Sequence, residues 1–185
     1  MELPRSFDCH ILLKLAVFIV VTTIHAQNYS LQTLIGGPLV TEGSTALSAV
    51  LRYATALASD SSGNLLIADH EDNRIWKVDP TGAITTYAGD NGPSAQANLN
   101  LPSGVTIDSV GNTHIAENGN ARIRLVTTDG VIQTIAGSGV GYPSNGDGSA
   151  LLCNFNPYRI AIGTNNAIYV ADWANNRVRL LTLSQ

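Results

Sequence analysis

Beyond the first 26 residues, the side chains best suited to metal chemistry are two histidines, His70 and His114. A catalytic zinc site takes three protein ligands, and these two histidines occupy different positions in the surrounding sequence pattern. The segment 145–149, NGDGS, resembles a calcium loop only weakly, since it lacks alternating oxygen ligands and a closing glutamate. GxSxG, a phosphate-binding loop and paired catalytic carboxylates are absent from the sequence. We therefore predict no catalytic residue, no metal ligand and no cofactor.

An acidic residue followed five positions later by an arginine occurs three times, in steps of 48 and then 55 residues. A catalytic group normally appears once in a protein, whereas this pair returns with every repeat. Each acid and arginine flank one predicted hairpin, so we expect them to pair with each other or to hydrogen-bond the turn backbone. These structural repeat positions are Asp69 with Arg74, Glu117 with Arg122, and Asp172 with Arg177.

The repeat predicts four short strands separated by turn residues. In the second copy the strands are expected at about 104–108, 113–117, 122–126 and 131–136, with Gly, Asn and Asp between them. Apolar residues occupy both faces of the third strand in each copy, so each small sheet should be covered on both sides. Four antiparallel strands repeated at about 48 residues predict an all-β fold of β-propeller blades.

The motif from Pro102 to Gly137, PxGVxxDxxGNxxIAExxNxRIRxVxxDGxIxTIAG, closely resembles the NHL repeat. The first copy lacks the proline, and in the third copy Asn166 stands at a glycine position. The resemblance implies blades at about 54–89, 102–137 and 157–183, plus an N-terminal strand at 31–36 whose sequence matches the fourth strand of a blade. It says less about activity, because propellers host many unrelated functions.

Three blades' worth of strands is fewer than the four to eight with which propellers close. The third copy stops after its third strand, and the strand 31–36 has no blade before it. An open arc would expose apolar blade faces, which soluble monomers rarely tolerate. We consider two arrangements: a homodimer in which two chains build one six-bladed ring, or a fragment of a longer propeller.

Antiparallel order places the turn between strands two and three of each blade at the same end as the connections to the next blade, 90–101 and 138–156. Loops on a rigid scaffold commonly carry function, although they can also be ordinary solvated turns. The candidate binding rim at this end comprises His70, Glu71, Asp72, Asn118, Tyr142, Trp173 and Asn175.

The N-terminal segment 1–26 predicts a secretory signal peptide, with Arg5 before an apolar run and Ala26 at the cut. The run is too short for a stable membrane span, so we expect the mature domain 27–185 to be secreted. Cleavage removes two basic and two acidic residues, which leaves 8 basic against 12 acidic and keeps the net charge at -4. This balance argues against nucleic acid as partner. Asn28 begins a glycosylation sequon. Cys153 has no partner for an internal disulfide, so it is either a buried, inert thiol, which we favour, or pairs with another chain.

The function that these features favour is that of a binding or interaction module. Its ligand, an unidentified protein or glycan, would be held by the loop-rich rim. The alternative is a propeller enzyme, either a metal-dependent peptide-amidating lyase or a lactonase, because secreted amidating lyases resemble NHL propellers. Those lyases need histidine ligands that a single chain, with His70 and His114, does not supply.

Overall fold

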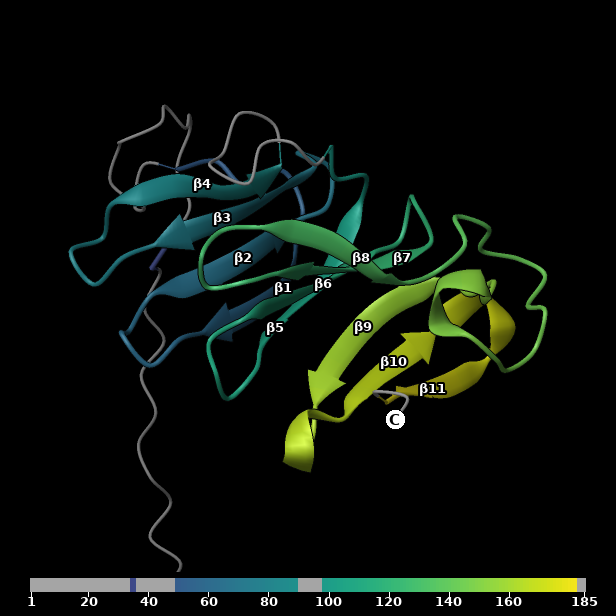
Figure 1. Ribbon diagram of the computed structural model, residues 1–185. Helices are drawn as coiled ribbons and strands as arrows, with labels where there is room; N and C mark the ends of the chain where they lie inside the picture. Colours follow the sequence, from purple (N-terminus) through teal and green to yellow (C-terminus); the bar gives the residue numbers. More distant parts are fainter. Residues whose placement is uncertain (1–33, 36–48, 90–97, 183–185) are drawn as a thin grey trace, which may run out of the picture. The chain divides into compact units, whose positions relative to one another are not determined.

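A computed structural model describes residues 34–35, 49–89 and 98–182, all within one compact unit, Thr33–Gln185. The described residues form three antiparallel sheets, and within each the strands follow one another in chain order. Figure 1 shows β1 to β4 side by side in the first of them. The first sheet consists of β1 (Ala54–Ser59), β2 (Leu65–Asp69), β3 (Arg74–Val78) and β4 (Ile84–Gly89). The second consists of β5 (Pro102–Ile107), β6 (Thr113–Glu117), β7 (Arg122–Val126) and β8 (Ile132–Ala136). The third consists of β9 (Pro157–Ile162), β10 (Ile168–Asp172) and β11 (Arg177–Leu181).

The described residues contain no α-helix, only short 3-10 turns, and none of their helical segments is long and apolar enough to span a membrane. The 3-10 turns are η2 (Ala150–Leu152), η3 (Thr164–Asn166) and η4 (Trp173–Asn175). The all-β blade architecture expected from the repeats is thereby confirmed. The predicted signal peptide 1–26, Asn28, and all of the strand 31–36 except Leu34 and Ile35 lie outside the described residues.

The turn between the first two strands of a blade is shaped by an aspartate and a glycine. The Asp60 carboxylate accepts the backbone N–H groups of Ser62 and Asn64, at 2.9 and 2.8 Å. Gly63 follows with a φ of 82°, a conformation that glycine adopts without strain. Asp108 repeats the arrangement in the second sheet, where it accepts the N–H groups of Val110 and Asn112. In the third sheet Asn166 takes the left-handed conformation instead, with a φ of 56°.

The first strand of each sheet (β1, β5 and β9), which we call the innermost strand, contains a bulge near its beginning. The register between β1 and β2 shifts between Ala54 and Ala56, which leaves Thr55 as the extra residue. Equivalent shifts make Ser103 the extra residue of β5 and Tyr158 that of β9. The bulge frees the side chain at this position from the regular pleat, and in the first two sheets its hydroxyl reaches the next sheet.

The core consists of apolar clusters between successive sheets. Ile75 from the first sheet and Ile115 from the second belong to one cluster, and Ile123 and Val170 belong to the cluster between the second and third sheets. A third cluster lies on the other face of the first sheet, where Leu57 nevertheless remains 63% exposed. The expectation that every sheet is covered on both faces is wrong for the third sheet. There Val178 is 75% exposed, because among the described residues no further sheet packs on that face.

Candidate binding rim

The three acids at the hairpins are fully buried and hold the chain where it enters each innermost strand. Asp69 accepts the backbone N–H groups of Arg52 and Tyr53, at 3.0 and 2.9 Å. Glu117 and Asp172 accept the equivalent N–H groups of Asn100 and Asn156, at 2.8 and 2.7 Å. Each carboxylate therefore ties the second strand of its blade to the segment that leads into the first. This is a structural role that returns with every repeat.

The arginine that pairs with the acid in two of the copies is not the one expected from the sequence. Arg124 places Nη1 3.3 Å from the Glu117 Oε2, and Arg179 places Nε 3.1 Å from the Asp172 Oδ2. Both arginines lie two residues beyond the positions singled out in the sequence. Arg74 instead ion-pairs with Asp72 in its own hairpin turn, at 3.4 Å. The expected pairs within the hairpin are thus replaced by diagonal pairs across the same two strands.

Arg179 also fastens the long connection 138–156 to the third sheet. Its guanidinium donates to the Gly146 carbonyl at 3.0 Å, to the Asp147 carboxylate at 2.6 Å and to the Ser144 hydroxyl. The Asn175 side chain donates to the Gly141 carbonyl at 3.1 Å and accepts the Ser144 N–H at 3.0 Å. The connection is therefore held on both sides of the two residues between Gly141 and Ser144.

Tyr142 lies between these two fixed points and remains 69% exposed. Trp173, in the η4 turn to which the connection is bonded, is 67% exposed. The centroids of the Trp173 and Tyr158 rings lie 5.9 Å apart. The Arg159 guanidinium lies 4.5 Å from the centroid of the Tyr158 ring. We call Tyr142, Tyr158, Arg159 and Trp173 the rim patch. Exposed aromatic rings on a fixed backbone offer contact area at little conformational cost.

The remaining rim residues predicted from the sequence are mostly engaged within the protein. Asn118 donates to Asn156 at 2.5 Å and so links the second sheet to the entry of the third. His70 packs edge-on against Tyr53, with ring centroids 5.8 Å apart. Asp72 pairs with Arg74, as described above. Tyr158 and Arg159 were not expected at the rim, because the bulge that follows Pro157 leaves no clear mark in the sequence.

The turns at the opposite end of the sheets line a depression whose walls include Asp60 and Asp108. A hydrogen bond from the Asn64 side chain is the main reason that the pKa of Asp60 lies below its ordinary value. Burial raises the pKa of Asp108, but hydrogen bonds from Asn112, His114 and the turn backbone outweigh it and leave that pKa below the ordinary value. Because these carboxylates already serve their own turns, the depression offers a ligand less than the rim patch does.

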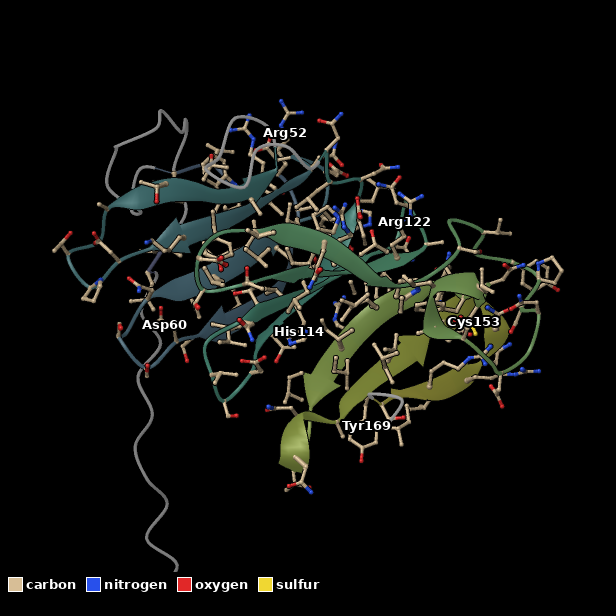
Figure 2. The ribbon with its side chains drawn as sticks, viewed as in Figure 1. Arg52, Asp60, His114, Arg122, Cys153 and Tyr169 are labelled. Carbon is tan, nitrogen blue, oxygen red and sulfur yellow. The ribbon has the colours of Figure 1, made fainter. Side chains whose placement is uncertain are left out.

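The two histidines lie at opposite ends of neighbouring sheets. His114 on β6 is 6% exposed, and its Nε2 lies 3.2 Å from the Asp108 carboxylate (both sheets are shown with side chains in Figure 2). His70 follows β2 at the rim. Among the described residues, no three His, Cys, Asp or Glu side chains are grouped so that they could hold a metal ion. Cys153 is partly buried and packs against the cluster between the second and third sheets.

No protein-family model and no curated protein matches the chain, whereas solved structures do. A protein of unknown function from Bacteroides thetaiotaomicron is 25% identical, with a TM-score of 0.57 over 64% of this chain and 32% of its own. An auxiliary nutrient binding protein from Bacteroides ovatus is 20% identical, with a TM-score of 0.57 over 70% and 37%. A chain of the nidogen/laminin complex is 20% identical, with a TM-score of 0.52 over 71% and 43%.

The chain thus spans about a third to two fifths of the length of these structures. The likeness supports the fold assignment: the chain is an all-β segment of a β-propeller, built from consecutive four-stranded blades of which the last has three described strands.

Proposed function

We propose that the chain is a secreted, NHL-type propeller module that binds a protein or a glycan through the rim patch. The observation that carries this proposal is the placement of Tyr142 and Trp173. Both aromatic side chains are about two thirds exposed, on backbone that Arg179 and Asn175 fix by hydrogen bonds. The two exposed rings therefore lie on backbone that is already fixed, so binding a ligand would cost little conformational entropy.

Either ligand class is compatible with this surface. Aromatic rings stack on the apolar faces of sugar rings, and they also anchor protein partners in the centre of interfaces. Support for a protein partner comes from the similarity to a chain of the nidogen/laminin complex, which is itself a protein–protein complex. At 20% identity that likeness concerns the fold, so the choice between protein and glycan falls to experiment.

The test screens the secreted chain against immobilised neutral and acidic oligosaccharides and a panel of purified extracellular proteins. Tyr142→Ala and Trp173→Ala should each weaken binding of any hit by about 10- to 100-fold, as expected for aromatic anchors. Val110→Ala is the matched control, because Val110 is 68% exposed in a turn at the opposite end. Unchanged affinity in both rim variants would place the binding site elsewhere.

Secretion and processing form part of the same proposal. Cleavage after Ala26, with or without a glycan on Asn28, sets the intact mass of the chain recovered from culture medium. A chain retained in the cell with residues 1–26 still attached would reject secretion.

The propeller-enzyme alternative requires a metal centre. Its test is metal analysis of the purified chain, together with lyase and lactonase assays on the His70→Ala and His114→Ala variants. Bound metal that is lost in both variants, together with an activity lost with it, would favour the enzyme over the binding module.

For partners other than the rim ligand, we propose a second copy of the chain, which would complete a six-bladed ring.

A further inference from the structure

Three side chains of the third sheet depart from the repeat, and they lie together at the rim. Tyr158 is the extra residue of the bulge in β9, Arg159 follows it, and Trp173 follows β10. The equivalent positions in the first two sheets hold Thr55 and Ser103, Ala56 and Gly104, and His70 and Asn118. Because the first two sheets form without such side chains at these positions, the blade fold itself does not explain them.

The bulge and its neighbours hold the Arg159 guanidinium in one place. Successive residues of a regular strand point to opposite faces, whereas a bulge re-aims a side chain, and here Arg159 lies 4.5 Å from the ring centroid of Tyr158. Its Nη1 donates to the Ser103 carbonyl at 2.5 Å and to the Tyr158 carbonyl at 3.1 Å. Gly104 lets β5 and β9 come this close, because a Cβ there would lie only 3.3 Å from the Arg159 Cα. The guanidinium is therefore fixed before any ligand binds.

The other edge of this guanidinium is open. Nε and Nη2 of Arg159 have no acceptor among the residues that the structure describes, and neither is a buried atom. Within the same residues Arg159 forms no ion pair, whereas Arg124 and Arg179 each pair with a buried acid. The Nε and Nη2 donors of a guanidinium point the same way and match the two oxygens of one carboxylate. The rim patch thus presents an oriented cation that can hold a carboxylate by both oxygens.

Amide groups with unused hydrogen-bonding capacity lie beside Trp173. The Trp173 N–H donates to the Asn156 carbonyl at 3.1 Å, and the Asn118 Nδ2 donates to the Asn156 Oδ1. The Asn156 Nδ2 and the Asn118 Oδ1 then remain as one donor and one acceptor with no partner in the described part of the chain. A ligand hydroxyl both donates and accepts, so it can satisfy either of them.

The spacing of these groups suits a short stretch of sugar. The Trp173 ring centroid lies 5.9 Å from that of Tyr158, and the Arg159 guanidinium lies 4.5 Å from the same centroid. Since both distances are measured to one ring, the indole and the guanidinium lie within the length of a disaccharide. A protein partner would have to match each free amide with a group of the right kind or leave it buried and unsatisfied. Sugar hydroxyls meet both amides, which favours a glycan.

Building on the binding function proposed above, we propose that the rim patch binds a glycan in which one sugar residue bears a carboxylate, a uronic or a sialic acid. Arg159 donates through Nε and Nη2 to the two carboxylate oxygens. The apolar face of the sugar ring stacks on Trp173. Sugar hydroxyls hydrogen-bond the Asn118 and Asn156 side chains.

The test measures binding of oligosaccharides to the secreted full-length chain by isothermal titration calorimetry. Two acidic probes, one containing glucuronic acid and one ending in sialic acid, are each compared with the form in which the carboxyl is reduced to a hydroxyl. We expect at least one acidic probe to bind about tenfold or more tightly than its reduced form, because reduction removes the charge-assisted bonds to Arg159. A sulfated neutral oligosaccharide is the third arm, and it should bind less tightly than the carboxylate.

Variants assign the carboxylate to one side chain. Arg159→Met should weaken binding of the acidic probe by about 10- to 100-fold and leave the affinity for the reduced form unchanged. Trp173→Ala should weaken both forms alike. Arg177→Met is the matched control, because it removes an exposed arginine of the same sheet that lies on the opposite face from Arg159. If circular dichroism shows that Arg159→Met is unfolded, the comparison of acidic and reduced probes on the natural chain still decides.

Four results would overturn the inference: equal affinity for the acidic and reduced forms, tighter binding of the sulfated form, no binding of either acidic probe at about 1 mM, or a protein ligand with no glycan binding. An Arg159→Met variant that loses both forms alike would overturn it too. In each case a ligand that still depends on Trp173 or Tyr142 would leave the rim patch as the binding site. A ligand indifferent to both rings would instead reject the proposed function.

Discussion

The buried acid of each hairpin can be tested by removing either partner of its ion pair in the second sheet. Glu117 is 0% exposed; it accepts the Asn100 N–H at 2.8 Å and lies 3.3 Å from Arg124, whose side chain is only 13% exposed. Glu117→Ala leaves a buried guanidinium and a backbone N–H without their acceptor. Breaking a buried pair in this way costs about 3–5 kcal/mol. The melting temperature should then fall by roughly 10 °C.

Removing the arginine should cost less. In Arg124→Met, Glu117 keeps the Asn100 N–H and the Asn120 side-chain donor. The first sheet supports this expectation, because Trp76 occupies the position of Arg124 and Asp69 is held there by two backbone N–H groups. Both donors that remain bind Oε1, so Oε2 loses its bond from Arg124, and we expect a loss of about 2 kcal/mol. Arg122 is the arginine that the sequence predicts as the partner. Arg122→Met should lower the free energy of unfolding far less than Glu117→Ala does.

Urea denaturation at pH 7 gives the free energy of unfolding of the three variants. We expect Glu117→Ala to be the least stable of the three. Arg124→Met should be more stable than Glu117→Ala, and Arg122→Met should be at least as stable as Arg124→Met. If Glu117→Ala were as stable as the natural chain, the buried acid would not be structural, and its recurrence would need a functional explanation. If Arg122→Met proved the most damaging, the diagonal pairing would be wrong.

Three further changes probe other parts of the fold. Gly137→Ala should destabilise the fold by about 3 kcal/mol or more, because its Cβ would lie 2.1 Å from the Ala121 carbonyl oxygen. At the control position, Gly130→Ala, the added Cβ meets nothing within 4 Å and should cost about 1 kcal/mol for its positive φ. Similar melting temperatures for the two variants would contradict this packing. His114→Leu should be about as stable in urea as the natural chain. Leu66 occupies the equivalent position in the first sheet, and the buried His114 Nδ1 has no hydrogen-bond partner. A loss of more than about 2 kcal/mol in the free energy of unfolding would show that the histidine is needed. Acid titration followed by circular dichroism should show stability falling below about pH 4: the pKa of Asp108 lies below its ordinary 3.8 in the fold, so its contribution is present above that value and is lost as pH falls through the folded pKa. Asp108→Asn should flatten this acid limb, and an unchanged limb would exclude Asp108 as its source.

Much of the fold could be predicted from local chemistry. The Asp-x-x-Gly-Asn turns specify backbone conformation directly, as Gly63 and Gly111 show with φ values of 82° and 94°. Alternation along β3 and β7 correctly assigned Ile75 and Ile123 to one face and Val78 and Val126 to the other.

The ion pairs could not be predicted in the same way. Arg122 and Arg124 both lie on the face of Glu117, since residues two apart in a strand share a face, and the sequence does not say which reaches the acid. The sequence favours Arg122 as the partner because arginine occupies this position in every copy, as Arg74, Arg122 and Arg177. The alignment of Arg124 with Arg179, 55 residues apart, was the available signal for the true partner. Tyr158 was missed because a bulge changes where a side chain points without leaving a clear sequence mark.

Hydrogen exchange read by mass spectrometry along the natural chain tests the central claim most directly. If the chain folds into consecutive blades, the amide groups in the second and third strands of all three repeats should be the most protected from exchange. These strands are β2 and β3, β6 and β7, and β10 and β11, and the turns between them should exchange fast. Protection that runs unbroken through those turns, or that is missing from one whole repeat, would show that the repeated hairpins do not build like sheets.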